Sequence, residues 1–230
     1  MPRTARASVG GICYHVINRG NGREKVFRVA EDYEAFVSLL GEAAERVRVR
    51  VLAYCLMPNH FHLVLWPRAD GDLSRFMQWL LTAQVRRYHR HHRGSGHVWQ
   101  GRFKAFPIAQ DEHLLTVLRY VERNALRAGL VDRAESWAWS SIHWWRQRRG
   151  GPAFLEEGPV DRGGRWVREV NRPMTAAEEE SLRRSVNRGT PWGAASWQQR
   201  VAAKLGLESS LHPLGRPRKP GPKTRRNLKK

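Results

Sequence analysis

Apolar and polar residues alternate along residues 12–18, and this period of two predicts a β-strand. Residues 49–56, 60–66 and 102–109 are three further predicted strands. Three longer stretches repeat their apolar residues every three or four positions, which predicts helices. They are residues 31–47, 73–90 and 112–128. The order of these elements is typical of a ferredoxin-like antiparallel sheet with helices on one face, an α+β fold.

Local signals mark the ends of several of these elements. Asp32 is a predicted N-cap of the first helix, and Gly129 suits the position after the end of the third. Met57, Pro58 and Asn59 form a predicted turn between the second and third strands. These two strands therefore form a predicted hairpin.

The composition changes after about residue 150, where Gly, Pro and Arg become frequent and the apolar periodicity weakens. We therefore predict one main domain over residues 1–150 and a small helical extension over 151–210, with short helices at 175–187 and 194–205. Residues 211–230 hold eight Lys and Arg and no acidic residue. Such a basic tail is predicted to be disordered in isolation.

The chain carries 41 Lys and Arg against 21 Asp and Glu, a formal net charge of +20. Such an excess favours a polyanionic partner: nucleic acid first, and an anionic membrane surface as the alternative. The sequence contains no apolar run of about 18 residues and no signal-like start, which predicts a cytoplasmic, nucleoid-associated protein. Cys13 and Cys55, the two cysteines, both lie in strand-like runs and are predicted to be buried free thiols.

His60 and His62 lie two positions apart on a predicted strand, so their side chains point to the same face. Two imidazoles in this arrangement could bind one divalent ion. The intervening Phe61 points to the opposite, buried face. The pair taken alone would equally fit an ordinary sheet surface.

Tyr120 and Asn124 lie four positions apart on the third predicted helix and therefore share a face. Beside the histidine strand, Asn124 could supply an oxygen ligand and Tyr120 a nucleophile, the combination that phosphoryl transfer needs. Tyr120 taken alone would also fit an aromatic anchor at a helix edge. Among the other tyrosines, Tyr88 at the basic end of the second helix is the one rival nucleophile.

Five blocks of the sequence, in order, resemble one family. Residues 57–66 look like the histidine–hydrophobe–histidine strand of HUH nucleases, and residues 14–20 resemble the opening strand of the single-tyrosine insertion-sequence transposases. Residues 96–104, 120–131 and 137–141 resemble the loop, nucleophile helix and following segment of their REP-associated branch. The resemblance covers about residues 8–145.

This resemblance implies the chemistry of the site. In that family a divalent ion, Mg²⁺ or Mn²⁺, is bound by positions that correspond to His60, His62 and Asn124. The position of Tyr120 attacks single-stranded or hairpin DNA and keeps the 5′ phosphate as a phosphotyrosine. The family usually has proline after the asparagine, where this chain has Ala125. Its members include monomers and homodimers.

Basic and aromatic residues around the second helix and the loop after it are candidates for binding DNA, because cations meet phosphates and aromatic rings stack on unpaired bases. They are Arg86, Arg87, Arg90, Arg93, His97, Trp99, Arg102, Phe103 and Lys104. Residues 215–220 also resemble an AT-hook, which would place Arg216, Arg218 and Lys219 in a minor groove. A general electrostatic tether would equally account for this segment.

Three other interpretations remain open. One is a DNA-binding protein without nuclease activity, derived from a transposase. Another is a plasmid relaxase or replication initiator, although these tend to be longer and often carry a third metal-binding histidine. The last is an RNA-binding protein. A basic, aromatic surface is compatible with RNA binding, but RNA binding does not require the paired histidines and the tyrosine.

Overall fold

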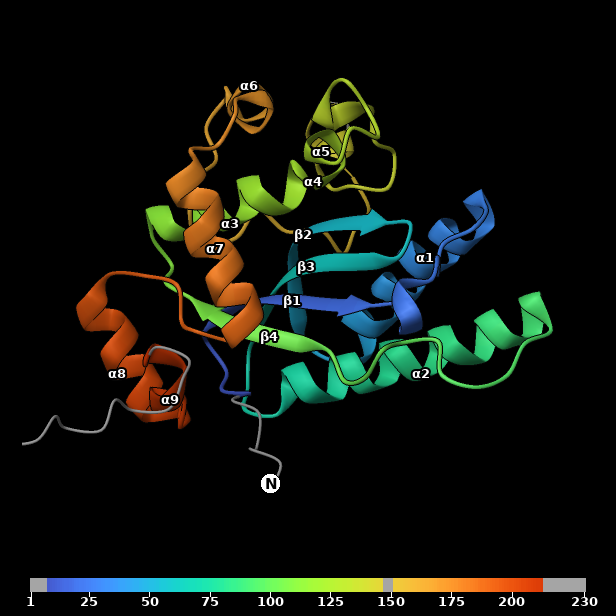
Figure 1. Ribbon diagram of the computed structural model, residues 1–230, viewed down its shortest axis with the longest axis horizontal. Coiled ribbons are helices and arrows are strands. Elements are labelled where there is room, and N and C mark those ends of the chain that lie inside the picture. The colour runs from blue at the N-terminus through green and yellow to red at the C-terminus, as the bar shows by residue number, and fades with distance from the viewer. Residues whose placement is uncertain (1–7, 147–150, 213–230) are drawn as a thin grey trace, which may run out of the picture.

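The structure, a computed structural model, describes residues 8–146 and 151–212. One antiparallel sheet forms its centre, with the strand order β2-β3-β1-β4 (Figure 1). The strands are β1 (Cys13–Arg19), β2 (Val49–Met57), β3 (His60–Pro67) and β4 (Lys104–Ile108). The α+β fold with an antiparallel sheet is therefore confirmed.

Helices α1 (Ala30–Arg46) and α2 (Asp72–His92) pack side by side on one face of the sheet (Figure 1). Phe36 of α1 and Phe76 of α2 join Phe61 of β3 in one buried apolar core. The apolar residues of both helices recur three or four positions apart, so a single stripe of each helix faces the strands.

The opposite face is covered by α3 (Glu112–Glu122), by the short α4 (Asn124–Arg127) and by helices from the C-terminal part of the chain. Leu114 of α3 meets Val64 of β3 and Phe106 of β4 in a second core. Helices thus lie on both faces of the sheet, whereas the element order predicted one face. The reason is that the strands are largely apolar on both sides, and each apolar face must be covered.

The C-terminal part of the chain packs directly against β4. Its helices are α6 (Trp166–Asn171), α7 (Ala176–Arg188), α8 (Ala195–Leu205) and the single turn α9 (Glu208–Leu211). The backbone N–H of Trp192 donates to the carbonyl of Pro107, and Ala109 donates to the carbonyl of Trp192, both at 2.8 Å. The extension is therefore attached to the edge of the sheet, and the domain division after residue 150 stays a prediction.

Two helix boundaries differ from the sequence pattern. Helix α1 begins after Val29, and the carboxylate of Asp32 accepts the N–H groups of Arg28 at 2.9 Å and Val29 at 3.3 Å from within the first turn. Asp32 is therefore not the N-cap; at the third helical position it supplies the acidic half of a capping box, whose other half a valine N-cap cannot provide. The third predicted helix is divided at Arg123 into α3 and α4. The remaining short elements are η1 (Asn21–Arg23), η2 (Ala134–Ser136) and α5 (Ile142–Arg146).

Two predictions from composition concern the cysteines and membranes. Cys13 and Cys55 are fully buried free thiols, as predicted, and burial raises the pKa of each to about 12. None of the described helices combines the length and the apolar composition that crossing a membrane requires.

Candidate active site

Three histidines meet on the α3 side of the sheet. His62 lies opposite Ile17 in the β1–β3 ladder and His60 lies opposite Arg19, so the alternation along β1 brings His15 to the same face. Nε2 of His15 lies 2.8 Å from Nδ1 of His62. The two rings stack with 7° between their planes and 5.0 Å between their centroids.

His60 and His62 fit a divalent ion. Nδ1 of His60 lies 2.7 Å from Oδ1 of Asn59, and Nδ1 of His62 is held by His15. Neither Nε2 atom has a hydrogen-bond partner among the described residues, and the two ring centroids are 5.1 Å apart. A partner on Nδ1 fixes the ring and leaves the Nε2 lone pair for a metal.

All three imidazoles are in the neutral form that binds metals. Burial lowers the pKa of His15 to about 3. Burial, followed by the nearby charges of Arg19 and Arg127, lowers the pKa of His60 to about 4. Burial and the neighbouring histidines hold the pKa of His62 well below its usual value. No proton therefore has to leave these rings before they bind an ion at neutral pH.

The side-chain oxygen of Asn124, one helical turn after Tyr120, already has a partner. The fully buried amide donates from Nδ2 to the carbonyl of Tyr120 at 2.9 Å, and its Oδ1 accepts a hydrogen bond from Arg127 at 2.7 Å. The amide oxygen has two lone pairs, so a metal would either share it with the Arg127 guanidinium or displace that group. The role of Asn124 as a ligand therefore stays a proposal.

Tyr120 stands edge-on above the stacked histidines. Its ring centroid is 5.8 Å from that of His62 and 6.2 Å from that of His15, with both pairs of rings close to perpendicular. The guanidinium of Arg127 lies 5.3 Å from the same ring, and only 6% of Tyr120 is exposed. The fold thus brings the predicted nucleophile, the predicted histidines and a cation together.

The rival tyrosine lies on the other side of the sheet. The Tyr88 ring is 4.5 Å from that of His92, which with Asp32 and His91 forms a group whose ligand atoms lie within 4.8 Å of one another. The carboxylate of Asp32 is already occupied by the two backbone N–H groups of the capping box and by Nε2 of His92 at 3.0 Å. The second such group in the described part of the chain consists of Asp111, Glu112 and His113. Neither group contains a predicted ligand.

A buried polar network fixes the helix that carries Tyr120. Glu122 is fully buried, and its carboxylate accepts hydrogen bonds from Ser141 Oγ and Trp166 Nε1, both at 2.6 Å. The guanidinium of Arg162 lies 3.5 Å from the same carboxylate. Two of these four residues belong to the C-terminal part of the chain, so this part helps to set the position of α3.

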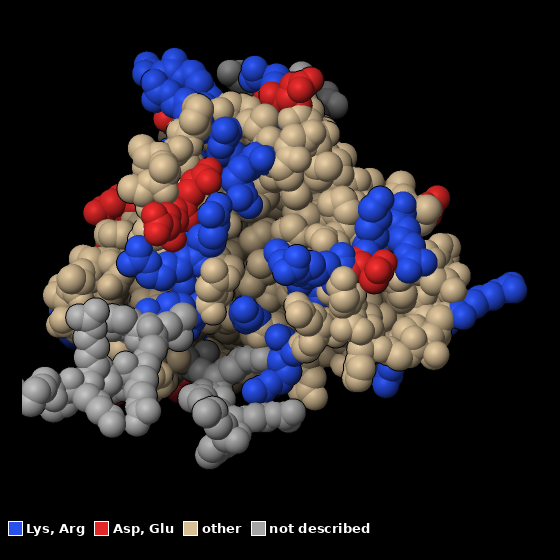
Figure 2. Space-filling view, viewed as in Figure 1, with Lys and Arg blue, Asp and Glu red and all other residues tan. Residues whose placement is uncertain are grey.

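Two of the residues predicted to bind DNA border the histidine face. Arg102 and Lys104 line a pocket of about 220 Å³ together with Arg19, which the sequence analysis did not assign. Lys104 lies opposite Ile17 in the sheet, one strand away from His62. Figure 2 shows Lys and Arg side chains gathered around a hollow on this side of the molecule.

The other predicted basic residues are placed differently. Four belong to the last turns of α2 or directly follow it, on the face of the sheet opposite the histidines, and one lies in the loop after α2. They are Arg86, Arg87, Arg90, Arg93 and His97. The AT-hook-like residues Arg216, Arg218 and Lys219 lie outside the described residues.

Trp99 and Phe103 are core residues, which corrects their prediction as platforms for DNA bases. Each is only 6% exposed. The Trp99 ring packs edge-on against Phe61 at 5.1 Å, and its indole N–H donates to Gln84 Oε1 at 3.0 Å. Arg102 and Lys104, on either side of Phe103, are exposed and basic, so the loop has the composition of a nucleic-acid-binding segment although its two aromatic rings are buried.

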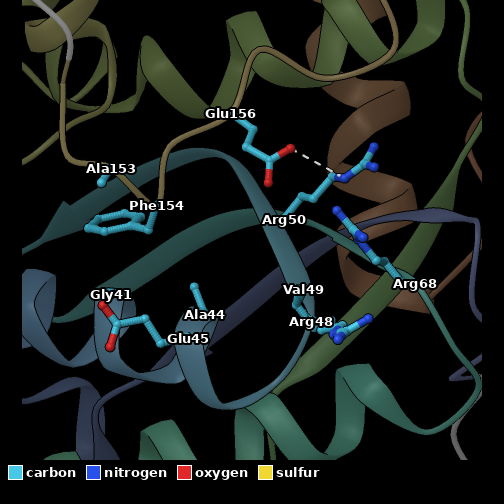
Figure 3. Close-up of a pocket in the computed structure, with 10 residues that line it drawn as sticks. All are labelled: Gly41, Ala44, Glu45, Arg48, Val49, Arg50, Arg68, Ala153, Phe154 and Glu156. Carbon is cyan, nitrogen blue, oxygen red and sulfur yellow. Dashed lines mark ion pairs between the residues drawn. The ribbon is translucent and has the colours of Figure 1, made fainter.

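A larger hollow, of about 380 Å³, lies at the other end of β2 and β3 (Figure 3). Arg48, Arg50 and Arg68 line it, and Arg50 pairs with Glu156 at 3.2 Å. It begins where β3 ends, whereas His60 is the first residue of that strand. This hollow holds no tyrosine or histidine among its described lining residues and is separate from the candidate active site.

Comparisons with known proteins agree with the geometry. Residues 8–124, just over half of the chain, match the family model described as transposase IS200 like. A Haemophilus influenzae protein assigned as a putative REP-associated tyrosine transposase is 28% identical over 119 residues, 47% of this chain and 67% of that protein. The solved structure of a REP-associated tyrosine transposase bound to a REP hairpin aligns with a TM-score of 0.52 and 20% identity, over 70% of this chain and 94% of that chain.

Proposed function

The chain belongs to the IS200-like transposase family, and from this premise we propose that it cuts and rejoins single-stranded DNA through Tyr120. The observation that carries the proposal is the Tyr120 ring standing 5.8 Å from the His62 ring, on the face where two neutral imidazoles leave Nε2 free. His60 and His62 would bind Mg²⁺ or Mn²⁺. Asn124 would join them, with its oxygen either shared with Arg127 or released by it.

The reaction needs few groups from the chain. The Tyr120 oxygen attacks the scissile phosphorus, a bond from phosphorus to tyrosine forms, and the bond to the 3′ oxygen breaks. The tyrosine loses its proton and the leaving 3′ oxygen gains one, which yields a 5′-phosphotyrosine and a free 3′ hydroxyl. Bound between the histidines, a divalent ion would polarise the phosphate and offset its growing charge.

Rejoining is the reverse step. A 3′ hydroxyl attacks the phosphotyrosine, and the tyrosine oxygen leaves. Because one phosphodiester bond is exchanged for another of similar energy, no nucleotide cofactor is required. Glu122 fixes α3, and with it Tyr120, against the sheet that carries the two histidines.

A non-catalytic DNA-binding protein is the second candidate. The contact between Arg127 and Asn124 and the burial of Tyr120 favour it, because the first engages the expected ligand oxygen and the second limits the access of DNA to the nucleophile. DNA is the proposed partner in either case, and the transposase whose solved structure aligns with this chain is bound to a REP hairpin.

Covalent trapping separates the two candidates. The chain is incubated with hairpin oligonucleotides from the DNA that flanks its own gene, with Mg²⁺, Mn²⁺ or EDTA, and run on a denaturing gel. A metal-dependent adduct that is lost in Tyr120→Phe and kept in Tyr88→Phe supports the enzyme. Hairpin binding without an adduct supports the non-catalytic protein, and an adduct lost only in Tyr88→Phe moves the active site to the group around His92.

A further inference from the structure

Helix α7, from the part of the chain beyond the family match, stands beside the candidate active site. Leu182 of α7 is fully buried in the core that also contains Phe106 of β4. The helix ends at Gly189, whose left-handed backbone (φ 73°) allows its N–H to bond the carbonyl of Ser185 at 2.8 Å. Backbone hydrogen bonds between Trp192 and β4 fix the segment that follows. This end of α7 therefore has a defined place on the sheet.

The pocket bordering the histidine face has α7 as its outer wall. Val186 and Asn187 of α7 line it, facing residues from β1, β4 and the loop before β4. The other lining residues are Ile17, Asn18, Arg19, Gln100, Gly101, Arg102 and Lys104. Ile17 lies opposite His62 and Arg19 lies opposite His60. The pocket is thus one strand away from the two proposed metal ligands.

The lining combines the groups that a nucleotide requires. Arg19, Arg102 and Lys104 are exposed cations, suited to phosphate. The amides of Gln100 and Asn187 form no hydrogen bond with other described residues, and such amides can pair with the edge of a base. Ile17 and Val186 add apolar surface for the face of the base.

The geometry points to a binding site for one nucleotide of the substrate strand, next to the scissile phosphate, with Asn187 of α7 contributing to the choice of base. This inference rests on the proposed function for its substrate, single-stranded DNA. It assigns the C-terminal part of the chain a direct place in DNA recognition.

A pair of neighbouring arginines on α7 supplies a matched control. At 3.6 residues per turn, Arg183 lies about 60° from Val186 around the helix, on the pocket side, whereas Arg184 lies about 160° away. Both side chains are exposed. Removing either one changes the net charge equally. Arg183 also forms a surface ion pair with Glu179 at 3.8 Å, a contact of little energetic weight, so a difference in salt dependence reports the pocket and not the overall charge.

The test measures DNA binding in EDTA by fluorescence anisotropy. The probe is a labelled DNA hairpin with an unpaired tail of adenines, cytosines or thymines. Asn187→Ala is expected to weaken binding roughly fivefold for the preferred tail and to reduce the difference between tails. Arg183→Ala should lower the salt dependence by about one phosphate contact, and Arg184→Ala should leave it nearly unchanged. The thermal unfolding midpoint should not change, because Asn187 is exposed.

Two results would overturn the inference: an Asn187→Ala protein with wild-type affinity and tail preference, or equal losses in Arg183→Ala and Arg184→Ala. Because binding in EDTA involves no cleavage, the test is independent of catalysis. If Tyr120 forms an adduct but Asn187→Ala has no effect, the proposed function holds and the nucleotide site is wrong. If Asn187→Ala loses the tail preference but no adduct forms, the nucleotide site holds and the proposed function is wrong.

Discussion

Arg127 donates a hydrogen bond of 2.7 Å to the amide oxygen of Asn124. Its guanidinium also lies 5.3 Å from the Tyr120 ring and helps to lower the pKa values of His60 and His62. One cation therefore competes with a metal ion in two ways: it engages one lone pair of the expected oxygen ligand, and it repels positive charge. The scissile phosphate is an anion that could draw Arg127 away from Asn124.

We predict that Arg127→Ala binds Mn²⁺ more tightly in the absence of DNA, by on the order of tenfold, because an amide oxygen is released and a like charge is removed. Titration followed by electron paramagnetic resonance of free Mn²⁺ would measure this. The double variant Arg127→Ala/Asn124→Ala should lose most of the gain. An unchanged affinity in Arg127→Ala would show that Asn124 is not a ligand.

Stability should fall as the pH falls below the ordinary histidine pKa. Burial lowers the pKa of His60 from 6.5 to about 4 and that of His15 to about 3. Between these values the unfolded chain binds protons that the folded chain does not, so the free energy of unfolding decreases by roughly 1.4 kcal/mol per pH unit for each histidine. Urea unfolding at a series of pH values would measure the slope. His15→Gln should make it shallower, and an equal slope would contradict the assignment.

Glu122→Gln should destabilise the fold by roughly 3 kcal/mol, because the buried guanidinium of Arg162 loses its partner charge. Glu169→Gln removes a half-exposed pair with Arg172 and should cost less than about 1 kcal/mol. Urea unfolding of both variants gives the comparison. Similar losses in the two would mean that the Glu122 network does not hold α3 in place.

Trp99→Ala should lower the free energy of unfolding by about 4 kcal/mol, since it empties a site in the core. Trp99→Phe keeps most of the volume and should cost clearly less. Thermal unfolding and DNA binding are measured on the same samples. If Trp99→Ala kept its stability and lost only DNA affinity, the ring would be a base platform after all.

Local pattern predicted the elements of this fold well. The four strands and the main helices follow from the sequence, because each helix buries one regular apolar stripe and each strand is a short apolar run. The capping of α1 was misassigned because Asp at the N-cap and Asp at the third helical position both bond the first N–H groups. The break at Arg123 left no local signal, because its backbone remains in the helical region.

The site shows where sequence reasoning stops. His60, His62 and Tyr120 could be named because spacing on one strand or helix is a local property. His15 and Arg19 belong to the site only through the register between β1 and β3, which is not a local property. Val186 and Asn187 reach the pocket through a contact between distant segments, which neither composition nor periodicity encodes. The place of Trp99 and Phe103 in a basic segment predicts DNA binding, whereas their burial depends on packing against distant parts of the chain.

The C-terminal part of the chain holds α3 through backbone carbonyls, which accept hydrogen bonds from two arginine side chains near the end of that helix. Arg119 donates to the carbonyls of Arg172 and Pro173 at 2.8 Å, and Arg123 donates to those of Val170 and Asn171 at 3.3 and 2.9 Å. Every residue has a backbone carbonyl, so mutations can accumulate at the acceptor positions while this clamp, the set of hydrogen bonds from Arg119 and Arg123, is retained. Selection would act on the two arginines and on the path of the backbone. Related chains could therefore share this clamp while their sequences at the acceptor turn have diverged beyond recognition.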